Sequence, residues 1–132
     1  MDYEIFKNET KNYLKYKKRL IEVKEEIDDI FYKYTGVKGV RYDKIHTSYN
    51  EDLAIEVWDR MQRELKKPER EQKHLEDMIS HIEENLNKLN PGMQKIVVMV
   101  FCKGWTFERI GEKLGYTKVA IYLKVRRAIE KI

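Results

Sequence analysis

The sequence predicts an all-α protein in which a long antiparallel helical hairpin precedes a module of three short helices. Charged residues make up 38% and hydrophobic residues 42% of the chain, a balance typical of helical proteins with many surface ion pairs. Only six Gly and two Pro occur in 132 residues, so long stretches are free of helix breakers. Apolar side chains recur at helical rather than strand spacing, which favours helices throughout.

The first expected helix covers residues 3–34. Its apolar residues alternate at spacings of four and three, as in the seam of a coiled coil. We expect the helix to end at Thr35–Gly36, because glycine readily adopts the left-handed conformation that closes a helix. The seam consists of Phe6, Tyr13, Tyr16, Leu20, Val23, Ile27, Ile30 and Tyr34.

A mildly basic loop is expected at residues 35–52, where glycines and polar residues interrupt the helical spacing. Its basic and aromatic side chains fit a binding segment and a solvated connector equally well. A second long helix should begin near Asp52 and continue to Leu89. Pro68 lies within it, and proline removes one helical hydrogen bond, so we expect a kink or a new helix start at Lys67–Pro68.

Neither long helix can bury its apolar stripe alone. An antiparallel, coiled-coil-like hairpin over residues 1–89 buries both stripes against each other. Dimerisation through the same helices would extend this hairpin and bury more surface. The sequence therefore predicts a structural role for this hairpin and a homodimer as one candidate assembly.

Residues 90–132 predict three short helices. Asn90–Pro91 is typical of a helix start, since Asn caps free amides and Pro lacks only a hydrogen that is unpaired there. The second helix should run from Thr106 to Gly115, burying Phe107, Ile110 and Leu114. The third, over residues 117–132, should bury Ile121, Val125, Ala128 and Ile132. Gly111 would allow close helix approach and Gly115 a left-handed turn, so the last two helices form a helix-turn-helix.

The charge is concentrated in the same segment. Residues 90–132 contain nine Lys or Arg against three Glu, a net charge of +6, whereas the preceding residues carry −2. A basic end on a nearly neutral body favours a polyanionic partner for that end.

Residues 106–117, with the sequence TFERIGEKLGYT, are followed by Ile121 and Arg127–Ala128. This pattern resembles region 4 of sigma-70-type factors without a gap. Leu89–Asn90–Pro91 and the helix from Val97 to Gly104 extend the resemblance over the last third of the chain. The layout of the whole chain is similar to that of small phage and prophage transcriptional regulators of the ArpU/RinA type.

The resemblance implies a transcriptional regulator that binds double-stranded DNA, with helix 117–132 in the major groove. Sigma factors carry Arg, Glu and Gln at exposed positions near the start of this helix, where the present sequence has Lys118, Val119 and Leu123. Lys118 also lies in the first helical turn, where the helix dipole disfavours a cation unless an anion is near. The candidate DNA-binding residues are Thr106, Thr117, Lys118, Val119, Ala120, Tyr122, Leu123, Arg126 and Arg127.

Two other functions fit the sequence. One is a module that binds RNA polymerase without reading DNA, and the other is a small terminase-like subunit of a phage DNA-packaging machine. No catalytic residues, cofactor or metal site are predicted, because His74, Asp77 and His81 form only a polar stripe and Cys102 lies in an apolar run. The single cysteine and the absence of a signal-like N-terminus or a long apolar segment predict a cytoplasmic protein without a membrane span.

Overall fold

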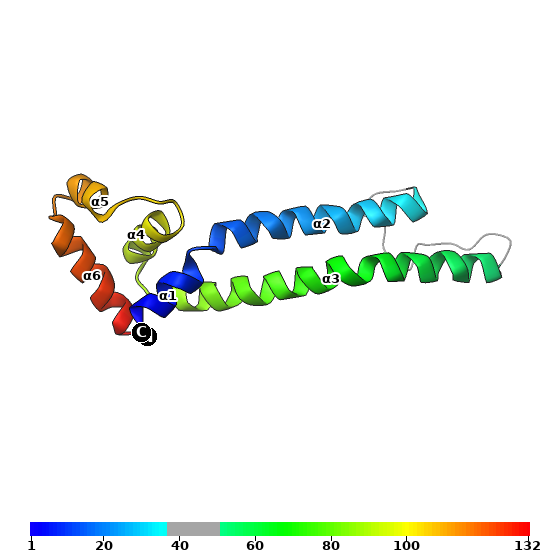
Figure 1. Ribbon diagram of the computed structural model, residues 1–132, viewed down its shortest axis with the longest axis horizontal. Helices are drawn as coiled ribbons and strands as arrows, with labels where there is room; N and C mark the ends of the chain where they lie inside the picture. Colours follow the sequence, from blue (N-terminus) through cyan, green and yellow to red (C-terminus); the bar gives the residue numbers. More distant parts are fainter. Residues whose placement is uncertain (37–50) are drawn as a thin grey trace. The chain divides into compact units, whose positions relative to one another are not determined.

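The computed structural model describes residues 1–36 and 51–132, and these residues form α-helices without a β-strand (Figure 1). The all-α prediction is therefore confirmed. Most of the basic loop expected at residues 35–52 falls outside this description. The helices are α1 (Tyr3–Thr10), α2 (Tyr13–Thr35), α3 (Glu51–Asn87), α4 (Pro91–Phe101), α5 (Phe107–Leu114) and α6 (Lys118–Glu130). In the same residues, no helix combines the length and apolar character that a membrane span requires.

The chain forms two compact units. The terminal unit combines Met1–Lys17 with Met78–Ile132, and the hairpin unit comprises Lys18–Asp77. The sequence analysis placed the boundary between residues 89 and 90 instead. The structure differs because α1 and the end of α3 share a core with the C-terminal helices.

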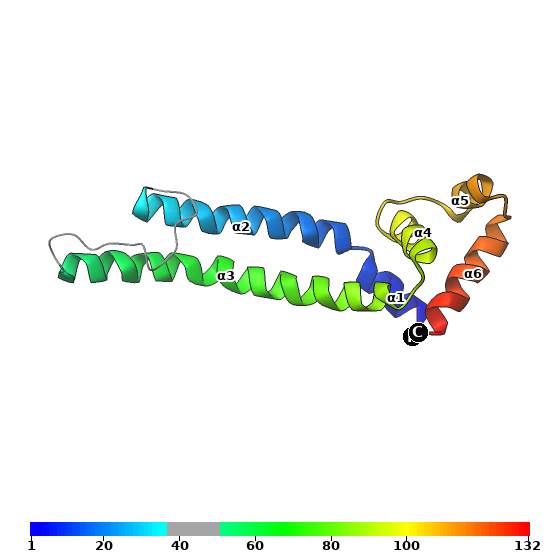
Figure 2. The ribbon, with the colours of Figure 1, turned by 180° about the vertical axis from the view of Figure 1, so that it is seen from behind.

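One apolar cluster holds the terminal unit together. Phe6 of α1 is fully buried in it, and the ring of Tyr3 packs edge-on against Phe101 and Tyr122. Two opposite views show α1 beside α4 and α6 (Figures 1 and 2). The core around the C-terminal helices therefore includes residues from both ends of the chain. The buried members are Tyr3, Phe6, Ile82, Leu86, Leu89, Val97, Ile110, Ile121, Val125 and Ile129.

The continuous helix expected over residues 3–34 is interrupted after Thr10. Thr10 is buried, and its carbonyl oxygen accepts a hydrogen bond from the Cys102 thiol at 3.1 Å. Burial raises the pKa of this thiol, so Cys102 is protonated and able to donate at neutral pH. The break lets α1 pack against α4 and α6. This tertiary packing was not indicated by the seam pattern. The helix does end at Thr35, with Gly36 at a φ of 76°, as predicted.

In the hairpin unit, α2 and α3 lie antiparallel (Figure 1). Phe31 packs with Met61 and Leu65, and the last of these is fully buried. The Arg19 guanidinium donates to both carboxylate oxygens of Glu71. The Nε–Oε1 distance is 2.6 Å and the Nη2–Oε2 distance is 3.1 Å. A two-point ion pair fixes geometry more than it adds stability at an exposed site, so it sets the register of the two helices.

Helix α3 continues without interruption through Pro68. The expected new helix start at Lys67–Pro68 is therefore wrong. Pro68 is itself buried, and Leu65 and Leu75 on either side of it are buried as well. Burial of this apolar face offsets the single backbone hydrogen bond that proline removes.

Candidate nucleic-acid interface

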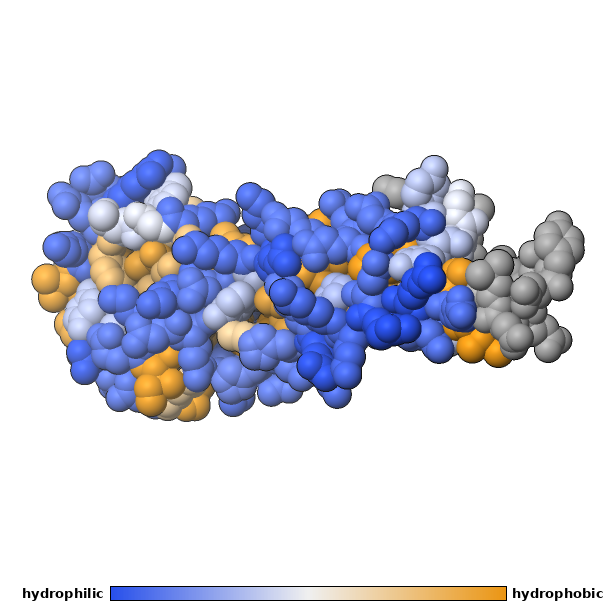
Figure 3. Space-filling model, turned by 45° about the vertical axis from the view of Figure 1, so that its right-hand side comes forward, coloured by the Kyte–Doolittle hydropathy of each residue, from blue (hydrophilic) through white to orange (hydrophobic). Residues whose placement is uncertain are grey.

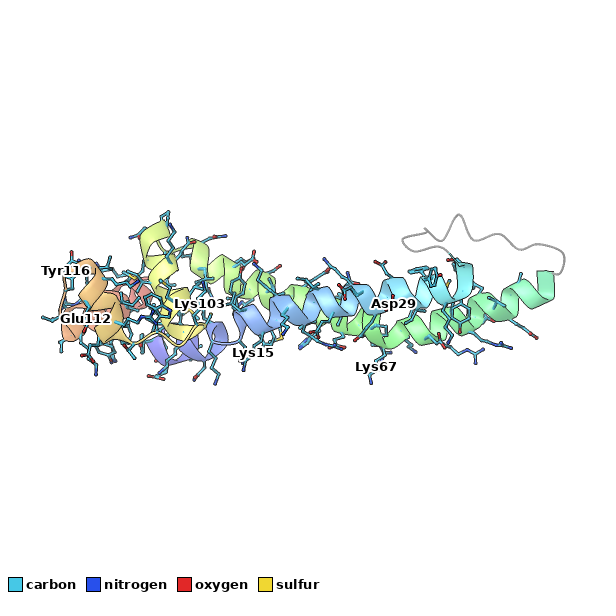
Figure 4. The ribbon with its side chains drawn as sticks, turned by 90° about the horizontal axis from the view of Figure 1, so that it is seen from above. Lys15, Asp29, Lys67, Lys103, Glu112 and Tyr116 are labelled. Atoms are coloured by element: carbon cyan, nitrogen blue, oxygen red, sulfur yellow. The ribbon has the colours of Figure 1, made fainter. Side chains whose placement is uncertain are left out.

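Helices α5 and α6, with α4 beside them, form a helix-turn-helix. Gly115 ends α5 in the left-handed conformation, at a φ of 79°, as predicted. A Cβ atom on Gly111 would lie 2.5 Å from the carbonyl oxygen of Tyr116, so only glycine fits this contact. Figure 4 shows Glu112 on α5 and Tyr116 in the turn together at the end of the terminal unit. The turn geometry thus fixes α6 against α5.

Two threonines begin the helices of the motif. The hydroxyl oxygen of Thr106 accepts from the Arg109 amide at 3.1 Å, and that of Thr117 accepts from the Ala120 amide at the same distance. Both therefore act as helix caps. Asn90 caps α4 in the same way and Pro91 follows it, as the sequence predicted.

The exposed face of α6 carries apolar side chains. Val119 is 63% exposed and Leu123, one turn later, is 37% exposed. Arg127 extends the same row by another turn and is exposed, while Ala120 beside it is half-buried. The opposite face, with Ile121 and Val125, is buried in the core. We call Val119, Leu123 and Arg127 the outer row of α6.

Cations lie on either side of this row. Lys118 is exposed in the first turn, and neither it nor Arg127 has a side-chain ion pair with any residue that the structure describes. Lys124, which the sequence analysis did not select, has its ammonium group 4.4 Å from the centre of the Tyr116 ring and 3.3 Å from its hydroxyl. Lys124 lies five residues after Val119, so helical spacing did not group it with the row. Its positive charge was the only feature of the sequence that indicated a role in binding DNA.

Tyr122 and Arg126 turn toward α1 instead. The Tyr122 ring packs edge-on against Tyr3 and Phe107, and its hydroxyl accepts from Arg126 at 2.7 Å. The Nε of Arg126 donates to Glu130 at 2.8 Å. The bond to Glu130, and then the bond to Tyr122, raise the pKa of Arg126. The structure thus separates these two residues from the outer row with which the sequence grouped them.

A second basic group surrounds Trp105 at the start of α5. The Arg109 guanidinium lies over the indole ring, 3.7 Å from its centre, and the Lys113 ammonium lies 4.9 Å from it. A cation over an indole face is held by the ring quadrupole. The sequence alone gave these residues no binding role, because a stacked pair depends on the turn between α4 and α5.

An apolar groove lies between α4 and α5, with a volume of about 360 Å³. Leu114, expected in the core, is 52% exposed at this groove, so that expectation is wrong. It follows the buried Ile110 by one turn of α5. Apolar patches also interrupt the hydrophilic surface over the α5–α6 end in the space-filling view (Figure 3). The groove is lined by Gly92, Lys95, Ile96, Met99, Trp105, Ile110, Lys113 and Leu114.

A family model described as Sigma-70, region 4 matches residues 85–132. The match begins in the last turn of α3 and includes α4, α5 and α6. These helices are therefore a sigma-70 region 4-like helix-turn-helix, which confirms that part of the resemblance and gives them a DNA-binding regulatory role. A search of curated proteins and a search of solved structures gave no match.

Proposed function

We propose that this protein is a DNA-binding transcriptional regulator of the phage or prophage type, which reads the major groove with α6. The observation that carries the proposal is the outer row of α6, exposed on the second helix of a helix-turn-helix and flanked by cations. In this class of motif the second helix enters the major groove. The long helices ahead of the motif support the phage-type assignment, because they repeat the layout of ArpU/RinA regulators.

The charge around the row suits a phosphate backbone. Lys118, Lys124 and Arg127 are exposed on or beside it, whereas Glu130 is occupied by Arg126. Each cation that meets a phosphate releases condensed counterions, so binding weakens as salt rises, by a slope of about 0.9 per contact.

Selection from a random duplex library would test this function. We expect the full chain to recover a defined sequence, and the recovered duplex to bind with strong salt dependence. The variant Lys118→Ala/Lys124→Ala/Arg127→Ala should bind more weakly and lower the salt slope by up to about three. The variant Lys66→Ala/Lys67→Ala/Lys73→Ala removes the same charge from exposed positions of α3 and should bind normally. Equal losses in both variants would contradict binding through α6.

A second candidate is an RNA polymerase contact through the apolar groove between α4 and α5. The groove itself favours this candidate, because Ile96, Met99 and Leu114 give it an apolar lining and apolar concave sites are typical binding sites. Leu114→Glu should then abolish co-purification with RNA polymerase and leave DNA binding intact. Retained co-purification would exclude the groove as the contact.

A further inference from the structure

We propose that α6 selects its DNA target through the 5-methyl groups of thymine, which Val119 and Leu123 contact in the major groove. This inference rests on the proposed DNA-binding function and names the base feature that the outer row reads. Its starting point is the chemistry of the row, which presents a valine and a leucine where a base-reading helix most often presents polar groups.

The exposure of the two side chains distinguishes them from ordinary surface residues. A single exposed apolar residue needs no explanation. Here two of them lie one turn apart on the same face, and Val119 keeps 63% of its surface in solvent. Both lie on the short helix that a helix-turn-helix inserts into DNA. Cations at Lys118 and Arg127 mark the two ends of the row.

Three polar side chains near the row already have partners within the protein. The Tyr122 hydroxyl accepts from Arg126, whose Nε is bound to Glu130. The Lys124 ammonium is held by the ring and hydroxyl of Tyr116. Within the part of the chain that the structure describes, Lys118 beside the row and Arg127 at its end have no such side-chain partner, so they are the polar groups best placed to bond base edges. The centre of the row offers only hydrocarbon.

The major groove displays one apolar group, the methyl group on C5 of thymine. The other base edges there carry hydrogen-bond donors and acceptors, which lose water without compensation when they meet a hydrocarbon surface. A cationic rim brings this surface against the duplex, and the anionic duplex is therefore the occupant that the charge favours over another protein chain. An apolar row held in the groove consequently favours base pairs that present thymine methyls.

Replacement of thymine by deoxyuridine tests the proposal, because it removes the methyl group and keeps all hydrogen bonds. The probe is a duplex recovered from the random library, with deoxyuridine introduced at one thymine at a time. We expect one or two positions at which affinity falls about three- to fivefold, the effect of burying one methyl-sized group. At those positions, 5-methylcytosine should bind more tightly than cytosine by a similar factor.

Two alanine variants connect the methyl effect to the row. Val119→Ala and Leu123→Ala remove exposed side chains, so the fold should be unaffected. Each variant should lose the difference between thymine and deoxyuridine at its own base pair, as a double-mutant cycle would show. The variant Ile21→Ala removes an equally exposed apolar residue from α2 and should keep the difference.

Two outcomes distinguish the reading of thymine methyls from DNA binding itself. If the wild-type protein binds DNA with salt dependence but binds thymine and deoxyuridine duplexes equally at every position, methyl reading is wrong and DNA binding stands. If the wild-type protein binds no duplex at all, both methyl reading and DNA binding by α6 are wrong.

Discussion

At the scale of single residues, Tyr13 has a raised pKa, and a pH titration of stability can detect this shift. Burial, and then its hydrogen bond to Glu83 at 3.0 Å, raise the pKa of Tyr13 to about 12. The folded state therefore holds this proton at a pH where the unfolded chain, with a tyrosine pKa of about 10, has lost it. The hydroxyl thus stabilises the fold below pH 10, and this contribution is lost as the pH rises toward 12.

The prediction concerns the free energy of unfolding between pH 10 and 12. It should fall more steeply with pH in the wild-type protein than in Tyr13→Phe, because only the wild type releases this proton on unfolding. Denaturant titrations at several pH values measure the difference. Other tyrosines and lysines titrate equally in both proteins, so parallel curves would show that the bond to Glu83 does not shift the ionisation of Tyr13.

Burial of single residues was predictable where it depends only on helical spacing within α6. Helical spacing identified Ile121 and Val125 as buried and Val119 as exposed, and the structure agrees. Tyr122 was assigned to DNA contact, but its ring packs against Tyr3. Because Tyr3 comes from the other end of the chain, no pattern within α6 indicates this contact.

At the scale of elements, α1 completes the core around the helix-turn-helix. We predict that Phe6→Ala lowers the free energy of unfolding by about 3–5 kcal/mol, since Phe6 is fully buried and the cavity can close only in part. Ile5→Ala is the matched control in the same helix, because Ile5 is 54% exposed, and it should change stability by less than about 0.5 kcal/mol. Chemical denaturation compares the two variants. Equal, small effects would mean that α1 is not part of this core.

The contact between α5 and the turn gives a second prediction at this scale. Gly111→Ala should cost about 1–3 kcal/mol, because the new methyl group meets the Tyr116 carbonyl oxygen and the turn must move. DNA affinity should fall as well, since the turn positions α6. Gly92→Ala serves as the control, because its Cβ would meet only the Asn90 side chain, at an ordinary 3.5 Å. Thermal melting and DNA titration of both variants measure the effects, and unchanged DNA binding by Gly111→Ala would contradict the role of the turn.

Local chemistry explains which elements were predictable. Asn90, Thr106, Thr117 and Gly115 cap or end helices through atoms only a few residues away, so the sequence located these boundaries. The break after Thr10 depends on packing with distant helices. The continuity of α3 through Pro68 depends on burial of its apolar face. Tertiary contacts of this kind override local propensity.

At the scale of the whole molecule, the positive charge is concentrated in a different set of residues from the set that forms a compact unit. The excess of +6 belongs to residues 90–132, but the compact terminal unit that carries them also needs Met1–Lys17 and the end of α3. A fragment limited to residues 90–132 lacks Tyr3, Phe6, Ile82 and Leu86 of the shared core. The fold of the helix-turn-helix therefore depends on both ends of the chain.

Photocrosslinking from α6 tests DNA contact most directly. A benzoylphenylalanine placed at Leu123 in the full chain should crosslink to a duplex recovered from the random library, because the proposed complex places the outer row against the bases. The same group at Ile21, which is more exposed than Leu123 and lies on α2, should give no crosslink. Bound duplex that crosslinks from position 21 and not from position 123 would show that DNA is held by another surface.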